Sequence, residues 1–531
     1  MLKRIKLSHL ARSTLLLAFF FGIDKIISFV RAAMVNRLFG LSFELDAFNA
    51  ANNIPDLLSS LISGGALGVA LIPVLSEFID KGDREGSWAV FTRILNLAFL
   101  VTGAIALLVV IFAPWLVENV IASGFPAEQR ALTTSLMRLD LIAIMIFAIS
   151  GLVMASLQAN QHFFLPALAP IMYNLGQIIG AGYLAPEGRA FLELAGFDGL
   201  GFGVYGIVYG VIIGAALHLL IQVPGLIKFG FRWQPRLELR SPAVTRVLTL
   251  LGPRVLTMFF IQMFFIVRDY VASFMDEGSV TALNLGWFIM QVPETLMGTT
   301  VAIALLPTIS EIFSRGERDN FRDTVNGALR VILALTIPVA LFMIAGISPL
   351  IKVAFGYTVE ETARVALATR IYLLGLTGHA MLEISARSFY AQQDAKTPLL
   401  AAFLNAIGYI AIVFLMTDWL GFGGIALANV TAFTLEALLL FYWLNRRFRG
   451  LLNVRDTLLR ALLPSFPLAA GVYWLVERQF AASADLTRAA IAAGLMVLGL
   501  ALTAPFVWRE LKLMLSLGGE RKPAQQPVQD A

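Results

Sequence analysis

Long runs of apolar residues dominate this chain, and short polar segments separate them at fairly regular intervals. A helix needs about 20 mostly apolar residues to cross a bilayer. By that measure the sequence predicts an all-α polytopic membrane protein with 14 transmembrane helices. Their expected ranges are 13–36, 46–78, 88–113, 133–158, 163–184, 201–227, 246–275, 279–313, 322–347, 364–391, 397–418, 422–445, 456–477 and 487–512.

Composition and charge exclude several classes of protein. Of the 531 residues, 58% are apolar and 14% are charged, against roughly 25% charged in a typical soluble domain. A soluble enzyme is therefore excluded, and the absence of cysteine excludes disulfides and thiol nucleophiles. Lysine and arginine concentrate in alternate connecting segments, which places both termini in the cytoplasm by the positive-inside rule. The net charge of +5 thus reports topology, and we expect no nucleic-acid partner.

The two halves of the chain share a sequence pattern. Residues 70–77 (ALIPVLSE) reappear as residues 304–311 (ALLPTISE), an offset of 234. Further along, Gln161 aligns with Gln393 in a second match. A third, weaker match aligns Gly203 with Gly421.

The duplication spans six predicted helices, an even number, so both copies should have the same orientation in the membrane. We expect two parallel-repeat six-helix lobes around a central cavity, as in alternating-access transporters. The expected divisions are an N-terminal lobe (1–228), a C-terminal lobe (229–449), an appended two-helix hairpin (450–515) and a disordered tail (516–531). A duplicated scaffold without transport is the alternative.

Charged residues inside the predicted spans mark candidate sites, because a charge in hydrocarbon needs a partner, water or a function. The first span carries Asp24, Lys25 and Arg31. These residues form either a structural ion pair, Asp24 with Lys25 or Arg31, or one wall of a cationic cavity. Fixed cations at a cavity would suit an anionic headgroup such as a phosphate.

The second span carries polar residues at alternating steps of three and four, which keeps them on one helix face. This face either packs against another helix or lines water, and small residues along it favour packing. The stripe consists of Asp46, Asn49, Asn53, Asp56, Ser60, Ser63 and Gly64.

Two later spans also carry ionisable residues. Span 246–275 holds Arg254, Arg268 and Asp269, whose arginines could extend to the membrane interfaces. Span 364–391 holds His379, Glu383 and Arg387 at steps of four. These three form either a helix-stabilising ion pair or a proton or cation relay. The chain has no Walker A, HExxH, nucleophile-elbow or dinucleotide motif, so we expect no enzyme.

Several motifs resemble the MurJ/MviN family of lipid II flippases in the MOP exporter superfamily. The resemblance begins at Phe29–Gly40 (FVRAAMVNRLFG) with Asp46-Ala47-Phe48 and continues through 54–58 (IPDLL) and 73–77 (PVLSE). It recurs at 278–280 (GSV), 291–293 (QVP) and 305–307 (LLP), and covers essentially the whole chain.

The resemblance implies transport of lipid II, an undecaprenyl-pyrophosphate-linked peptidoglycan precursor, from the inner to the outer leaflet of the bacterial cytoplasmic membrane. It also implies a V-shaped cavity between the lobes, a hairpin groove for the lipid tail, and cycling driven by membrane potential. Na⁺ or H⁺ would be the coupling ion, with no other cofactor. Lipids and cell-wall synthesis proteins would be the partners of a monomeric transporter.

Arg31 and Asp46 match cavity residues of the family, and Lys25 stands where a second arginine is usual. The family's arginine pair on its second helix falls on Ser59 and Ser60, and a further arginine falls on Phe288. A sodium-site aspartate falls on Arg268, next to Asp269.

The expected substrate-binding residues are Lys25, Arg31, Asp46, Asn49, Asn53, Asp56 and Arg254, and the expected coupling residues are Asp24, Asp269, His379 and Glu383. The substitutions at Ser59, Ser60 and Phe288 leave two transport alternatives open, a flippase for another polyprenyl-linked saccharide and a multidrug exporter of the same superfamily. A scaffold that recruits cell-wall enzymes without transporting is a separate alternative.

Overall fold

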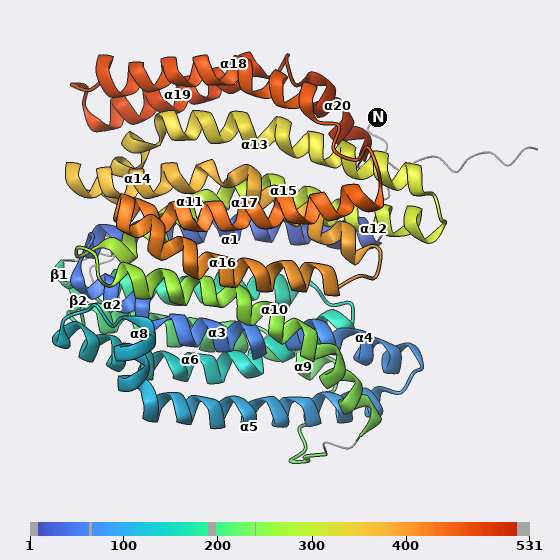
Figure 1. Ribbon diagram of the computed structural model, residues 1–531. Helices are drawn as coiled ribbons and strands as arrows, with labels where there is room; N and C mark the ends of the chain where they lie inside the picture. The colour runs from blue at the N-terminus through green and yellow to red at the C-terminus, as the bar shows by residue number, and fades with distance from the viewer. Residues whose placement is uncertain (1–8, 63–65, 190–197, 239–240, 518–531) are drawn as a thin grey trace, which may run out of the picture. The chain divides into compact units, whose positions relative to one another are not determined.

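The structure, a computed structural model, describes residues 9–62, 66–189, 198–238 and 241–517. These residues are nearly all helical, as expected (Figure 1). The first half contains α1 (His9–Phe39), α2 (Phe43–Ala51), α3 (Asn53–Ile62), α4 (Ala66–Asp80), α5 (Arg84–Leu116), η1 (Val117–Ile121), α6 (Ala127–Ala159), α7 (Phe164–Ile179), η2 (Gly180–Leu184), α8 (Val204–Leu220), α9 (Val223–Lys228) and α10 (Pro242–Ala272). Two short strands, β1 (Glu187–Arg189) and β2 (Asp198–Leu200), pair antiparallel between η2 and α8.

The second half continues the helical pattern. It contains α11 (Ser279–Glu294), η4 (Thr295–Thr299), α12 (Thr300–Ser314), α13 (Arg318–Phe355), α14 (Val359–Leu374), α15 (Leu376–Tyr390), α16 (Lys396–Leu420), α17 (Phe422–Arg447), α18 (Arg455–Trp474), η5 (Leu475–Gln479), α19 (Asp485–Thr503) and α20 (Trp508–Leu517). The predicted disordered tail lies outside the described residues from position 518 onward.

The helices confirm an all-α polytopic membrane protein but not the count of 14 spans. Within the described residues, 11 helices are long and apolar enough to cross a membrane. The count becomes 12 if α14 and α15, which are bent by 40° at their junction, form one broken span. The second predicted span, 46–78, is divided among α2, α3 and α4, none of which is among the 11.

Two compact units can be distinguished by their internal contacts. Unit 1 comprises 1–284 with 354–361, and unit 2 comprises 285–353 with 362–531. Helix α10 therefore packs within unit 1. The lobe boundary expected after residue 228 stays a prediction.

Each unit has its own apolar core. In unit 1, Leu71, Phe91 and Leu157 bring α4, α5 and α6 together. In unit 2, Phe321 and Phe441 belong to a core shared by α12, α13, α15 and α17. A smaller cluster, formed by buried side chains of α13, α18, η5 and α19, packs the appended hairpin onto α13.

The backbone repeats where the sequence repeats. Gln161 and Gln393, which align in the second match, have φ of 56° and 59°. They are the two non-glycine residues with positive φ in the described part of the chain. Gly203 and Gly421, aligned in the third match, have φ/ψ of 55°/−138° and 54°/−134°. Such unusual conformations would not coincide by chance, so the sequence matches reflect equivalent turns.

Candidate functional site

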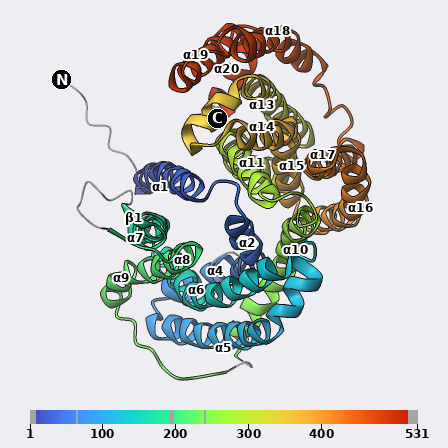
Figure 2. The same cartoon turned by 90° about the vertical axis from the view of Figure 1, so that its left-hand side faces the viewer.

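Helix α1 carries the first group of predicted site residues, and amide side chains of α7 hold two of them. Arg31 Nη1 donates to Gln177 Oε1 at 2.6 Å, and Asn174 Nδ2 donates to Asp24 Oδ1 at 2.8 Å. Lys25 is exposed. Among the described contacts, Asp24 forms no ion pair with Lys25 or Arg31. Neutral amides of α7 therefore position Arg31 and Asp24, while Asp24 and Asp56 act electrostatically on the Arg31 charge (Figure 2 shows α1 beside α7).

The first part of the polar stripe joins helices within unit 1. Asp46 is 1% exposed, and its carboxylate accepts bonds from Gly278 N at 2.7 Å, Thr281 N at 2.8 Å and Thr281 Oγ1 at 2.7 Å. Asn49 Nδ2 donates to the same hydroxyl at 3.0 Å. A carboxylate at the first turn of α11 satisfies N–H groups that have no partner within the helix and complements the helix dipole. Asp46 and Asn49 thus fix the start of α11.

Asn53 and Asp269 continue this network one turn further along the stripe. Asn53 Nδ2 donates to Asp269 Oδ2 at 2.8 Å, while Arg268 Nε donates to Asp269 Oδ1 at 2.7 Å. Arg268 Nη2 also donates to Asn284 Oδ1 at 2.6 Å. Arg268 and Asp269 are nearly fully buried, and each compensates the charge of the other. This part of the stripe packs α3 against α10.

Beyond Asn53 the stripe reaches a polar cavity of about 300 Å³ inside unit 1. Asp56 and Ser59 line it from α3, and Arg31 acts electrostatically on Asp56 from α1. Helices α6, α7 and α8 supply the rest of the lining: Asp140, Ala143, Ile144, Phe147, Gly151, Met154, Pro170, Tyr173, Val211 and His218. The stripe therefore packs helices together at its start and lines the cavity at Asp56, where Ser59, a neighbour outside the stripe, joins it.

Close packing of α7 and α8 places Tyr173 and His218 at this cavity. A Cβ atom on Gly210 would lie 2.6 Å from Gly180 Cα, closer than side-chain atoms ever approach. Two helices can approach this closely only where small residues face each other. Gly180 opens η2 directly after α7, so the two glycines set how closely this end of α7 approaches α8.

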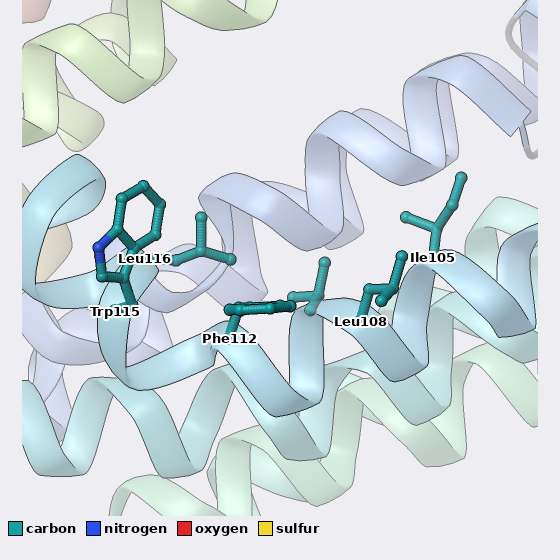
Figure 3. A pocket seen from close by; sticks show the side chains of 6 residues that line it. Ile105, Leu108, Phe112, Trp115 and Leu116 are labelled. Atoms are coloured by element: carbon teal, nitrogen blue, oxygen red, sulfur yellow. The ribbon is translucent and has the colours of Figure 1, made fainter.

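A larger recess of about 620 Å³ lies against α5 and is almost wholly apolar. Figure 3 shows its lining side chains along one side of the helix, with the Trp115 indole as the one polar group drawn. It is lined by Ile105, Leu108, Val109, Phe112, Trp115 and Leu116. Such a surface suits contact with hydrocarbon chains. The candidate site for polar groups is therefore the cavity at Asp56 and Asp140.

In unit 2, the residues predicted as a relay have local partners. Glu383 forms an ion pair with Arg387 one turn further along α15. The His379 ring is buried, with its centroid 5.0 Å from that of Trp287 and 4.5 Å from that of Phe433. Glu383 is therefore part of a local ion pair, and His379 packs against two aromatic rings.

One further predicted residue, Arg254, lies in α10, but its side chain falls outside the described part of the structure.

Three residues that line the cavity were not predicted from the sequence to do so, namely Asp140, Tyr173 and His218. Asp140 offered a signal, because it is an acidic residue inside the apolar span predicted at 133–158. Tyr173 offered none, since an aromatic residue is ordinary in a membrane helix.

Comparison with known proteins gives one consistent result. The family model for the lipid II flippase MurJ matches residues 35–490. The lipid II flippase MurJ of Burkholderia cenocepacia is 29% identical over 455 residues, which cover 83% of this chain and 84% of that protein. A probable lipid II flippase MurJ of Vibrio cholerae is 26% identical over 482 residues, covering 88% of this chain and 86% of the relative.

Solved structures share the fold. A lipid II flippase MurJ in an inward closed conformation superposes with a TM-score of 0.73 at 22% identity, covering 94% of this chain and 100% of that one. An inward-facing multidrug resistance transporter of the MATE family in the MOP superfamily superposes with a TM-score of 0.67 at 15% identity. The match covers 81% of this chain and 95% of that one. Since the family model spans most of the sequence, this chain is a member of the MurJ lipid II flippase family.

Proposed function

We propose that this protein moves lipid II from the inner to the outer leaflet of the bacterial cytoplasmic membrane by alternating access. The observation that carries the proposal is the match of the MurJ family model to residues 35–490. The lipid would cross unchanged, so the proposal assigns the chain no chemical step. It also places both termini in the cytoplasm and takes a monomer as the working unit.

Within this function, Arg31 and Lys25 would bind the pyrophosphate. Arg31 is held by a neutral amide and acts electrostatically on Asp56, which lines the cavity, and Lys25 is exposed six residues earlier on α1. Guanidinium groups bind phosphate oxygens through paired N–H donors. The hydroxyl and carboxylate groups of Ser59 and Asp56 would meet the sugar or peptide part of the headgroup.

The test is reconstitution of the full chain into liposomes that carry fluorescent lipid II. Translocation is followed by loss of fluorescence to a quencher that cannot cross the membrane. We expect the protein to accelerate quenching relative to protein-free liposomes. Equal rates with and without protein would contradict the proposal.

A second candidate, transport of a different polyprenyl-linked saccharide, is favoured by Ser59, which lines the cavity where an arginine was expected from the resemblance. The same assay separates the two candidates when lipid II is replaced by a polyprenyl-pyrophosphate sugar without a stem peptide. Faster movement of that lipid than of lipid II would favour the second candidate.

A further inference from the structure

Asp140, in the middle of α6, is a buried carboxylate whose Oδ1 has no hydrogen-bond donor among the described residues. The residue is only 4% exposed. It lies in a helix of 33 residues that is apolar enough to span the membrane. An ionised carboxylate without a partner is strongly unfavourable in such surroundings. The described residues supply no hydrogen bond to Oδ1 that would compensate this charge.

Asp140 faces the same cavity as Asp56, and the two carboxylates act on each other electrostatically. The cavity volume of about 300 Å³ is ample for a small ion and several waters. Ser59 and Tyr173 add hydroxyl oxygens to its lining. Two carboxylates from different helices therefore meet at a space large enough for a ligand.

His218 also faces the cavity but adds no positive charge. Its Nδ1 lies 2.6 Å from Ser150 Oγ, and Gln222 Nε2 donates to that oxygen at 3.0 Å. Gln222 Nε2 also lies 3.3 Å from Nδ1, and with two potential donors beside it Nδ1 fits the acceptor role of a neutral imidazole.

Arg31 is the one cation that acts on this group of residues in the described part of the chain. It interacts with Asp24, Asp56 and Tyr173, while the carboxylate that acts on Asp140 directly is Asp56. Three carboxylates and one guanidinium leave a net negative charge. The deficit is concentrated at Asp140.

We propose that Asp140 and Asp56 bind a small monovalent cation, either a proton or Na⁺, in this cavity. The described residues contain no group of three or more acidic or histidine side chains able to hold a metal ion, which argues against a divalent ion. Carboxylate, hydroxyl and water oxygens are the ligands that hard cations prefer. Two neighbouring carboxylates can alternatively share one proton.

Two of the four residues first predicted to couple transport to an ion have charged partners in the structure. Asp269 is bonded to Arg268 and Asn53, and Glu383 is paired with Arg387. Asp140 differs from them because its charge is uncompensated. If the proposed lipid transport holds, binding and release of the cation at Asp140 would bias the cavity between its two states.

Binding is tested first, without transport. The full chain in lipid nanodiscs is melted in NaCl and in choline chloride at equal ionic strength, and its infrared spectrum is recorded for a protonated carboxyl band. For a sodium site, NaCl alone raises the melting temperature of the wild type, and Asp140→Asn loses the shift. For a proton site, the wild-type spectrum contains a carboxyl band that is missing from its Asp140→Asn counterpart, so the band appears in the difference between the two spectra.

The control is Asp418→Asn, which changes an exposed aspartate of α16 and should behave as the wild type. If Asp140→Asn does not fold, Asp56→Asn removes the other carboxylate and should abolish the sodium shift of a sodium site, or alter the carboxyl band of a shared proton. A wild type that shows neither the sodium shift nor the band, or variants that keep the wild-type signal, would overturn the proposal.

Coupling is then tested in lipid II liposomes with a tenfold gradient of the bound cation. One coupled cation can bias the distribution of the lipid by up to about tenfold. We expect the wild type to respond to the gradient and Asp140→Asn not to respond. An equal response by Asp140→Asn would overturn the inference and leave the transport function intact. Cation binding without any lipid II movement would contradict the transport function alone.

Discussion

At the scale of single residues, Arg31 is the side chain on which lipid transport should depend most. A hydrogen bond between charged groups contributes about 1.5–3 kcal/mol, so we expect Arg31→Ala to slow lipid II translocation about ten- to hundredfold. Arg31→Lys keeps the charge but loses the paired N–H donors, so its rate should lie between the wild-type rate and the Arg31→Ala rate. The rates are measured in the liposome assay.

Arg449 offers a matched control, because it is an exposed arginine outside the cavity. Arg449→Ala should retain the wild-type rate. Full activity of Arg31→Ala would mean that the phosphate groups bind elsewhere.

Asp394, in the turn between α15 and α16, should make stability depend on pH. Burial raises the pKa of Asp394, but hydrogen bonds from Thr397 and Arg447 outweigh it, and the net pKa lies below its ordinary value. A lowered pKa in the folded state means stabilisation that is complete above the unfolded-state pKa of about 4 and lost as the pH falls through the folded-state pKa. Asp394→Asn should therefore melt below the wild type at pH 7.

This difference in melting temperature should shrink as the pH is lowered below about 4, where the wild-type carboxylate becomes protonated too. Thermal denaturation in detergent across a pH series measures it. A difference that stays constant over the whole series would show that the carboxylate charge has no part in the contact.

The polar stripe shows what sequence could predict about residues and what it could not. Helical spacing placed Asp46, Asn53 and Asp56 on one face, but it left open whether that face meets protein or water. The partners of Asp46 are Gly278 and Thr281, more than 230 residues away in sequence. Local periodicity carries no information about such distant donors. The same limit hid Asp140, whose importance comes from the absence of a partner.

At the scale of elements, apolar length predicted most helices well, because a membrane span needs a fixed length of apolar chain. It did not predict where helices break. Residues 364–391 were expected as one span, whereas α14 and α15 meet at a bend of 40°. The strands β1 and β2 were also missed, since three-residue strands are too short to show an alternating pattern.

Gly210 tests whether the close approach of α7 and α8 shapes the cavity. In Gly210→Ala, the added methyl group would overlap Gly180, and overpacking of this kind costs about 1–3 kcal/mol. We expect a lower melting temperature and slower lipid translocation, because Tyr173 and His218 would move apart.

Gly408 in α16 provides the comparison, because a Cβ atom there would meet nothing within 4 Å. Gly408→Ala should be neutral or stabilising by up to about 1 kcal/mol, since alanine favours helix over glycine. Equal effects of the two substitutions would show that the α7–α8 contact tolerates a larger separation.

At the scale of the whole molecule, the duplication and the distribution of basic residues together predict the orientation of every span. Equivalent turns at Gln161 and Gln393 support the repeat. The even number of helices expected in each copy then requires both copies to point the same way. Hydropathy alone could not supply this orientation, because an apolar helix is compatible with either direction.

The absence of cysteine makes this topology directly testable, because any introduced thiol is the single one in the chain. Three exposed sites are suited to it: Lys81 after α4, Glu128 at the start of α6, and Asp319 at the start of α13. In intact cells with a permeabilised outer envelope, a membrane-impermeant maleimide should label Glu128→Cys. Lys81→Cys and Asp319→Cys should be labelled after the inner membrane is opened. Labelling of Asp319→Cys but not Lys81→Cys in intact cells would contradict the parallel repeat, whereas reversal at all three sites would invert the orientation and preserve the repeat.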